Sequence, residues 1–187
     1  MFIQTEATPN PATLKFLPGR EVLSGEPRDF RDADTARLSP LASALFSLDG
    51  VAGVFLGADF VSVTKHDVVD WAHIKPAILG AVMEHFMSGK PILAEGAAAQ
   101  EATGDEFFEA EDAETVEVIK ELLDTRVRPA VAMDGGDITF KGYKEGTVFL
   151  QMQGACSGCP SSTATLKSGI ENLLRHFVPG VEQVQQI

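Results

Sequence analysis

Apolar residues in the first half of the chain, residues 1–93, occur in short runs separated by prolines, glycines and acidic residues. Runs of this length between turn-forming residues are typical of β-strands. Four strands are predicted on this basis: residues 2–5, 14–17, 51–56 and 60–64. The last two lie on either side of Gly57-Ala58-Asp59 and therefore predict a β-hairpin. Residues 25–35 are polar and are predicted to be a loop.

Two segments of the same half change to a helical period. Ser39 and Pro40 form a helix start, with a capping hydroxyl followed by proline at the first helical position. The leucines that follow fall on one face: Leu41, Leu45 and Leu48. A second helix is predicted near residues 71–87, because apolar residues recur there every fourth position, and Gly89 ends it.

Residues 112–187 show the same change of period in the order α-β-β-α-β. The predicted elements are a helix over residues 116–127, strands over 138–143 and 147–153, a helix ending near 177 and a strand over 181–187. The first helix is expected to stop before Pro129, and residues 134–137 (DGGD) are expected to be a turn that orients the hairpin. The fold class is therefore α+β, with two small domains.

Acidic residues are concentrated between these halves. The chain has 15 Lys and Arg against 27 Asp and Glu, a net charge of −12. Residues 94–114 carry eight acidic residues and no basic residue. Self-repulsion and a shortage of apolar surface keep such a segment extended. We therefore expect domains over residues 1–93 and 112–187, joined by a flexible acidic linker over 94–111, in which Phe107 and Phe108 are a candidate docking point.

The charge and the absence of motifs exclude several classes of function. A chain this acidic has no electrostatic footprint for nucleic acid or for an anionic membrane surface. Its longest apolar run, residues 77–83, is far shorter than the roughly 20 residues that span a bilayer. No targeting signal is visible, which favours the bacterial cytoplasm, or the mitochondrial matrix for a processed form. No phosphate loop, nucleophile elbow or zinc-protease motif occurs, so an enzyme is not expected.

The two cysteines, Cys156 and Cys159, form a Cys-x-x-Cys pair where a predicted strand ends and a helix begins. Gly158 frees the backbone between them, so both side chains can point the same way. The positive end of the helix is expected to favour the thiolate form. The pair alone is compatible with an iron–sulfur cluster, zinc, a dithiol switch or two small buried residues.

Counting ligands narrows these alternatives. A four-coordinate soft metal site needs four ligands, and the chain supplies two thiols. His176 lies 17 residues beyond Cys159 on the same predicted helix, roughly 25 Å away at 1.5 Å per residue. The other histidines lie across the linker: His66, His73 and His85. The simplest route to four thiolates is a symmetric homodimer, which suits a cluster that is readily given up.

Two other functions use the same cysteines. A dithiol oxidoreductase would cycle a Cys156–Cys159 disulfide, although thioredoxin-like folds place the pair earlier, with more strands following. A zinc-stabilised dimer would hold the metal permanently and melt early without it.

Two segments around these cysteines resemble a known domain. Residues 133–138 (MDGGDI), a hairpin and residues 154–162 (GACSGCPSS) are similar to the NifU C-terminal-type domain. Residues 2–6 (FIQTE), 8–11 (TPNP) and 14–16 (LKF) are similar to the N-terminal domain of Nfu proteins. Together, in this order, they resemble the two-domain Nfu family of iron–sulfur cluster scaffolds and carriers.

This resemblance implies a function and a set of partners. Cys156 and Cys159 of two subunits are expected to hold a [4Fe–4S] cluster, with [2Fe–2S] as the alternative, since both accept four thiolates. The cluster is expected to come from upstream assembly proteins or to be built on the dimer, and to pass to apo iron–sulfur client proteins. The N-terminal domain is expected to serve the recognition of clients or partners.

Overall fold

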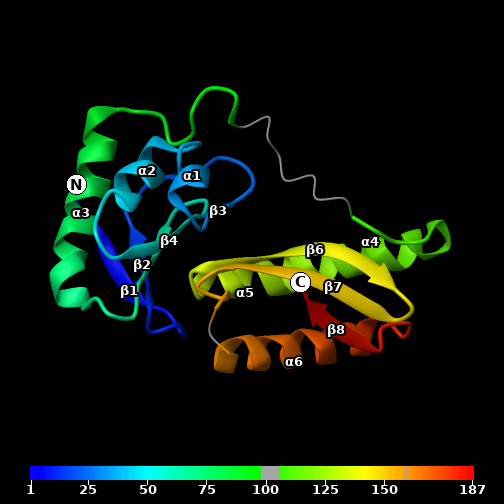
Figure 1. The fold of residues 1–187 in the computed structure, drawn as a ribbon. Helices are drawn as coiled ribbons and strands as arrows, with labels where there is room; N and C mark the ends of the chain where they lie inside the picture. Colours follow the sequence, from blue (N-terminus) through cyan, green and yellow to red (C-terminus); the bar gives the residue numbers. More distant parts are fainter. Residues whose placement is uncertain (98–105, 159) are drawn as a thin grey trace. The chain divides into compact units, whose positions relative to one another are not determined.

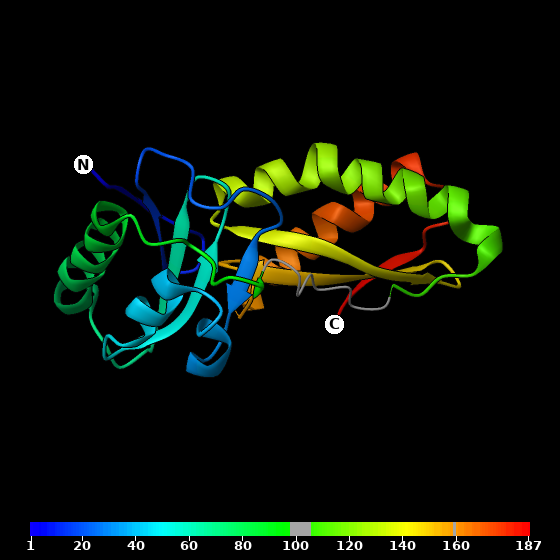
Figure 2. The same cartoon turned by 90° about the horizontal axis from the view of Figure 1, so that it is seen from above.

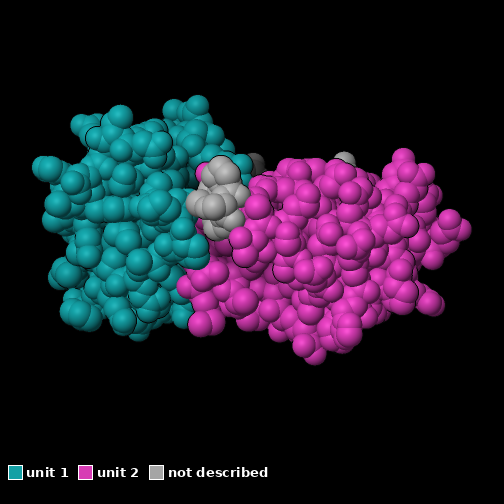
Figure 3. Space-filling view, turned by 90° about the horizontal axis from the view of Figure 1, so that it is seen from below, with its two compact units in different colours: residues 1–101 teal, residues 102–187 magenta. Residues whose placement is uncertain are grey.

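The computed structural model describes residues 1–97, 106–158 and 160–187. The chain divides into two compact units, Met1–Glu101 and Ala102–Ile187 (Figure 3). Each unit has its own sheet, helices and hydrophobic core. The prediction of an α+β fold with two domains is confirmed. Within the described ranges, no helix has both the length and the apolar character needed to cross a membrane.

The first unit is built on a five-stranded antiparallel sheet with the order β1-β2-β5-β4-β3 (Figure 1). Its strands are β1 (Gln4–Ala7), β2 (Thr13–Leu17), β3 (Arg28–Phe30), β4 (Val51–Leu56) and β5 (Val61–Lys65). The predicted hairpin of β4 and β5 is confirmed, with Val54 opposite Val63. Strand β2 pairs with β5, so its buried Phe16 lies opposite Val61 in the middle of the sheet.

The α-helices described beside this sheet are α1 (Ala33–Ala36), α2 (Pro40–Phe46) and α3 (Trp71–Ser88). The predicted start of α2 is confirmed, because the Ser39 hydroxyl accepts a hydrogen bond from the Ala42 N–H at 3.1 Å. Gly89 ends α3 in the left-handed conformation, with φ of 67°. Side chains of α2, α3 and the sheet share one core.

The expectation of a loop over residues 25–35 is wrong. That segment contains the edge strand β3 and the short helix α1. Pairing with β4 buries Phe30, and the Asp32 carboxylate caps α1 by accepting from the Thr35 N–H at 2.8 Å. A three-residue strand and a one-turn helix are too short to produce a recognisable hydrophobic period.

The second unit has the predicted α-β-β-α-β order and a three-stranded sheet, β6-β7-β8. Its elements are η2 (Ala110–Asp112), α4 (Ala113–Leu122), η3 (Leu123–Val127), α5 (Arg128–Met133), β6 (Gly136–Lys144), β7 (Thr147–Gly154), α6 (Pro160–Phe177) and β8 (Gln183–Gln186). Strands β6 and β7 are antiparallel, whereas β8 runs parallel to the central strand β7.

One face of this sheet carries the core. Alternate residues of β7 are fully buried, including Val148 and Leu150, and they pack with Ile119 of α4 and Leu174 of α6. The residue between them, Phe149, points to the opposite face and is half-buried. Figure 2 shows the helical run of α4 and α5 extending along the β6–β7 hairpin.

The first helical run does not stop before Pro129, as the sequence pattern predicted. It passes through the π-helical turn η3, in which the Arg128 N–H donates to the Leu123 carbonyl, and continues as α5 to Met133. The π turn widens the helix directly before a residue that has no N–H to donate. The DGGD turn is also shorter than expected, because β6 already begins at Gly136.

The two described ends of the expected linker contact their own units. The Ala94 N–H donates to the Leu38 carbonyl at 2.8 Å, and Ala97 is buried. At the other end, Phe107 forms a parallel β-bridge with Gly142 of β6. The middle of the expected linker, residues 98–105, lies outside the described residues.

Candidate metal centre

Cys156 lies in the turn that connects β7 to α6 and is only 7% exposed. Backbone bonds fix this turn, since the Ala155 N–H donates to the Gly135 carbonyl at 3.2 Å. The Thr163 hydroxyl of α6 donates to the Cys156 carbonyl at 3.1 Å. The backbone around Cys156 is therefore held from two sides: by the turn before β6 and by the first turns of α6.

Gly136, the first residue of β6, provides the space that the thiol occupies. A Cβ at this position would lie 2.8 Å from the Cys156 Sγ and 2.5 Å from the Gln153 carbonyl oxygen. Both distances are shorter than a real Cβ contact, so any side chain would displace either the thiol or the β6–β7 ladder. The second glycine of the DGGD segment thus has a steric role beside Cys156.

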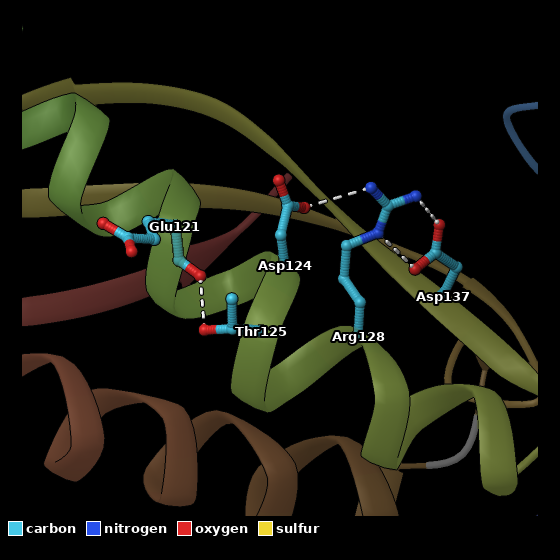
Figure 4. A network of polar contacts seen from close by, with 5 residues as sticks. All are labelled: Glu121, Asp124, Thr125, Arg128 and Asp137. Atoms are coloured by element: carbon cyan, nitrogen blue, oxygen red, sulfur yellow. Dashed lines mark hydrogen bonds and ion pairs between the residues drawn. The ribbon is translucent and has the colours of Figure 1, made fainter.

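The acidic residue after Gly136 anchors the same corner of the unit (Figure 4). Arg128 of α5 donates to both carboxylate oxygens of Asp137, through Nε at 3.0 Å and Nη2 at 2.9 Å. Its third contact is with Asp124 of η3, from Nη1 at 3.1 Å. The Asp137 side chain is 6% exposed, so this two-point pair is largely withdrawn from water. It ties the start of β6 to the helix that precedes it.

Burial and two acidic residues near the start of β6 raise the pKa of the thiol. Burial raises the pKa of Cys156 to about 12, and the negative charges of Asp134 and Asp137 act in the same direction. The expectation that the helix end favours the thiolate is therefore wrong for Cys156. The residue lies four positions before α6 begins at Pro160, and the effect of a helix dipole fades beyond the first turn, whereas burial and the two carboxylates act on the thiol directly.

The other predicted ligand, Cys159, lies outside the described residues. Among the residues that the structure describes, no three His, Cys, Asp or Glu side chains come together as a metal site. His85 is buried in α3 of the first unit, and His176 stands at the end of α6, edge-on to Phe177. The site thus offers Cys156, a soft donor.

Sequence reasoning missed three residues of this corner. Asp137 and Gly136 were assigned to a turn, and Arg128 was not singled out at all. A signal was present for Asp137, because an acidic residue at the start of an apolar strand needs a partner when it is buried. Nothing in the local pattern identified Arg128, since the helix was expected to end before it.

Comparison with known proteins agrees with this two-unit architecture. Residues 3–89 match the family described as scaffold protein Nfu/NifU N terminal, and residues 119–185 match the NifU-like domain. A Drosophila erecta protein, "NFU1 iron-sulfur cluster scaffold homolog, mitochondrial", is 53% identical over the whole chain, which covers 65% of that protein. "NifU-like protein 5, mitochondrial" of Arabidopsis thaliana is 52% identical, with 68% of it covered.

A solved structure is also similar. The solution structure of a NifU-like protein from Saccharomyces cerevisiae is 27% identical, covers 51% of this chain and 86% of its own, and has a TM-score of 0.46.

The two domain matches and the mitochondrial relatives define the family: the chain belongs to the two-domain Nfu family. It spans about 65% of the length of the Drosophila proteins it matches. The names of these relatives place them in mitochondria, so a bacterial cytoplasmic location finds no support among them.

Proposed function

We propose that this protein is an iron–sulfur cluster scaffold and carrier without a catalytic reaction of its own. Cys156 and Cys159 of two subunits hold one [4Fe–4S] cluster, which passes to apo-proteins that supply better-buried thiolates. The observation that carries the proposal is the position of Cys156, fixed in a turn with its Sγ beside Gly136, in a chain of the Nfu family. We place the protein in the mitochondrial matrix, as the names of its relatives suggest.

The chemistry of the donors supports this cargo. Thiolates are the usual ligands of iron–sulfur clusters, and two per chain make a complete set of four in a symmetric pair of chains. Iron must displace the thiol proton, so the raised pKa of Cys156 makes cluster binding dependent on pH and on the cluster's own positive iron charges. Protons and cluster iron compete for the Cys156 sulfur. A site with this competition is suited to releasing a cluster as well as to binding one.

The same pKa argues against Cys156 as the attacking cysteine of a dithiol oxidoreductase. An attacking cysteine in such an enzyme needs a thiolate near neutral pH, and burial keeps Cys156 protonated. A zinc-stabilised dimer uses the same four thiols and is distinguished by metal content.

Anaerobic reconstitution with iron and sulfide tests the proposal. We expect a brown protein that sediments as a dimer, with about four irons and four sulfides per two chains, as a [4Fe–4S] cluster requires. Cys156→Ser and Cys159→Ser should each abolish iron uptake, whereas Ser157→Ala, between them, should retain it. About two irons per dimer would identify the [2Fe–2S] alternative.

Two outcomes would reject the carrier. A colourless dimer that retains zinc and loses stability with a chelator would establish the zinc-stabilised dimer. A metal-free chain that reduces insulin disulfides, with Cys156→Ser inactive, would establish the oxidoreductase.

A further inference from the structure

The outer edge of β6 carries a built site that the cluster chemistry does not use. It is occupied by two residues from the acidic segment before α4, Glu106 and Phe107. The Phe107 N–H donates to the Lys141 carbonyl at 3.1 Å, and the Phe107 carbonyl accepts from the Tyr143 N–H at 2.9 Å. These two bonds add one residue of parallel strand to the edge of the sheet.

A local irregularity in β6 shapes this site. The register between β6 and β7 shifts between Phe140 and Gly142, so the strand bulges where Phe107 docks. An ideal Cβ on Gly142 would lie 2.5–2.6 Å from three atoms of the Phe107 ring. The ring thus occupies the space that the missing side chain leaves. It also packs against Phe149, with ring centroids 5.0 Å apart.

Charge complements this aromatic pocket. The Glu106 carboxylate accepts a hydrogen bond from the Lys120 ammonium of α4, and that ammonium lies 5.4 Å from the centre of the Phe140 ring. The site therefore recognises three features at once: an extended backbone, an aromatic side chain and an acidic residue directly before it.

The resident segment is held at the sheet edge without being enclosed. Its contacts are the bridge with its two backbone hydrogen bonds, the packing of Phe107 on Phe149 and the Glu106–Lys120 contact, and Phe107 remains 42% exposed. Its neighbour Phe108 is 40% exposed and takes no part in the bridge. An occupant that stays this exposed on the edge of a sheet can be exchanged for one with the same chemistry.

We propose that this β6-edge site, formed by Gly142, Phe149 and Lys120, is a docking site for a partner protein. The partner supplies an extended segment in which an acidic residue precedes an aromatic residue, and Glu106-Phe107 occupies the site when no partner is bound. The same two residues thereby hold the site closed against weak competitors, since a tethered occupant acts at an effective concentration on the order of millimolar.

The test measures binding of a fluorescent peptide, EFFEA, which copies residues 106–110, to the full-length chain without metal. Phe107→Ala empties the site and should bind the peptide at least roughly tenfold more tightly than the wild type, which retains its tethered competitor. Phe108→Ala is the matched control and should behave like the wild type. Glu106→Lys, which breaks the contact with Lys120, is a second way to release the segment and should also increase binding.

The double variant Phe107→Ala/Gly142→Ala identifies the pocket. The methyl group fills the space of the ring, so peptide binding should fall at least roughly tenfold from that of Phe107→Ala. A peptide with alanine at its first phenylalanine, EAFEA, should also fail to bind.

Three results would overturn the proposal. Phe107→Ala and Glu106→Lys could bind the peptide no better than the wild type does. The double variant Phe107→Ala/Gly142→Ala could bind it as tightly as Phe107→Ala. A metal-free wild type that sediments as a dimer, and becomes monomeric in Phe107→Ala, would show that the occupant is a second copy of this chain. Iron uptake is not part of this test, so its outcome is independent of the carrier function.

Discussion

The two units use buried polar groups in different ways. In the first unit, neutral side chains cap a helix and link distant segments: Ser39 caps α2 and donates to the Ile92 carbonyl, and the hydroxyls of Thr13 and Thr64 lie 2.8 Å apart between β2 and β5. In the second unit, Arg128 and Asp137 join an α-helix to a strand, next to the buried thiol of Cys156. The chemistry and part of the stability of the second unit are therefore located in the same corner.

The largest expected effect comes from Asp137→Ala. It leaves the guanidinium of Arg128 without its largely buried, two-point partner, and removing one member of a buried pair costs about 3 kcal/mol. The loss should fall on the second unit alone. Urea unfolding can separate the units, because the single Trp, Trp71, lies in the first and the single Tyr, Tyr143, in the second.

Asp124→Ala is the matched control for this variant. Asp124 contacts the same guanidinium, but its side chain is 60% exposed, so its removal should cost less than about 1 kcal/mol. Equal losses of unfolding free energy for Asp137→Ala and Asp124→Ala would mean that the buried pair has no special weight. A loss that Trp71 fluorescence also reports would mean that the effect is not confined to the second unit.

The next effect concerns Gly136→Ala. The added methyl group meets the Gln153 carbonyl and the Cys156 Sγ, so the β6–β7 ladder or the thiol must move, at about 2 kcal/mol. We expect a lower unfolding midpoint for the second unit and less iron bound per dimer on reconstitution. Gly169→Ala, in α6, meets no atom within 4 Å and should stabilise that helix by up to about 1 kcal/mol. If Gly136→Ala is as stable as Gly169→Ala and binds as much iron per dimer as the wild type, Gly136 does not position the thiol.

Most regular elements could be predicted from the sequence, because their patterns are local. The cap at Ser39, the β4–β5 hairpin and the α-β-β-α-β order each follow from residues within a few positions of one another. The predictions that were wrong concern elements that depend on contacts with residues outside the local sequence pattern. Strand β3 is defined by pairing with β4, and the continuation past Pro129 depends on a π turn.

The candidate site divides in the same way. The Cys-x-x-Cys pair is a motif and could be recognised, whereas the contacts of Cys156 could not. Its protonation is set by burial and by Asp134 and Asp137, about 20 residues earlier in the chain. The docking of Phe107 on Gly142 joins residues 35 positions apart and depends on a bulge in β6. The sequence identified Cys156 and Phe107 as candidates. The residues that contact or influence them could be identified only from the fold.

The smallest expected effect is in the first unit and depends on pH. His85 of α3 is 5% exposed, and its Nε2 has no hydrogen-bond partner within the described part of the chain. Burial lowers the pKa of His85, and the charge of Lys90 lowers it further. The unfolded chain therefore binds a proton more readily than the folded one. The contribution of neutral His85 to the free energy of unfolding is complete above its pKa in the unfolded chain, about 6.5. It is lost as the pH falls through the lowered pKa of His85 in the folded chain.

The predicted loss is at most about 1.4 kcal/mol for each pH unit below this value, the limit for one proton. Trp71 fluorescence during urea unfolding at pH 7.5, 6.5 and 5.5 should show it, and His85→Gln should flatten the profile. The same substitution at exposed His73, on the same helix, is the matched control. A wild-type profile that already matches His85→Gln would mean that His85 accepts its proton without loss. Burial of this imidazole would then not be a source of acid sensitivity in the first unit, and the lowered pKa of His85 would have no counterpart in its unfolding free energy.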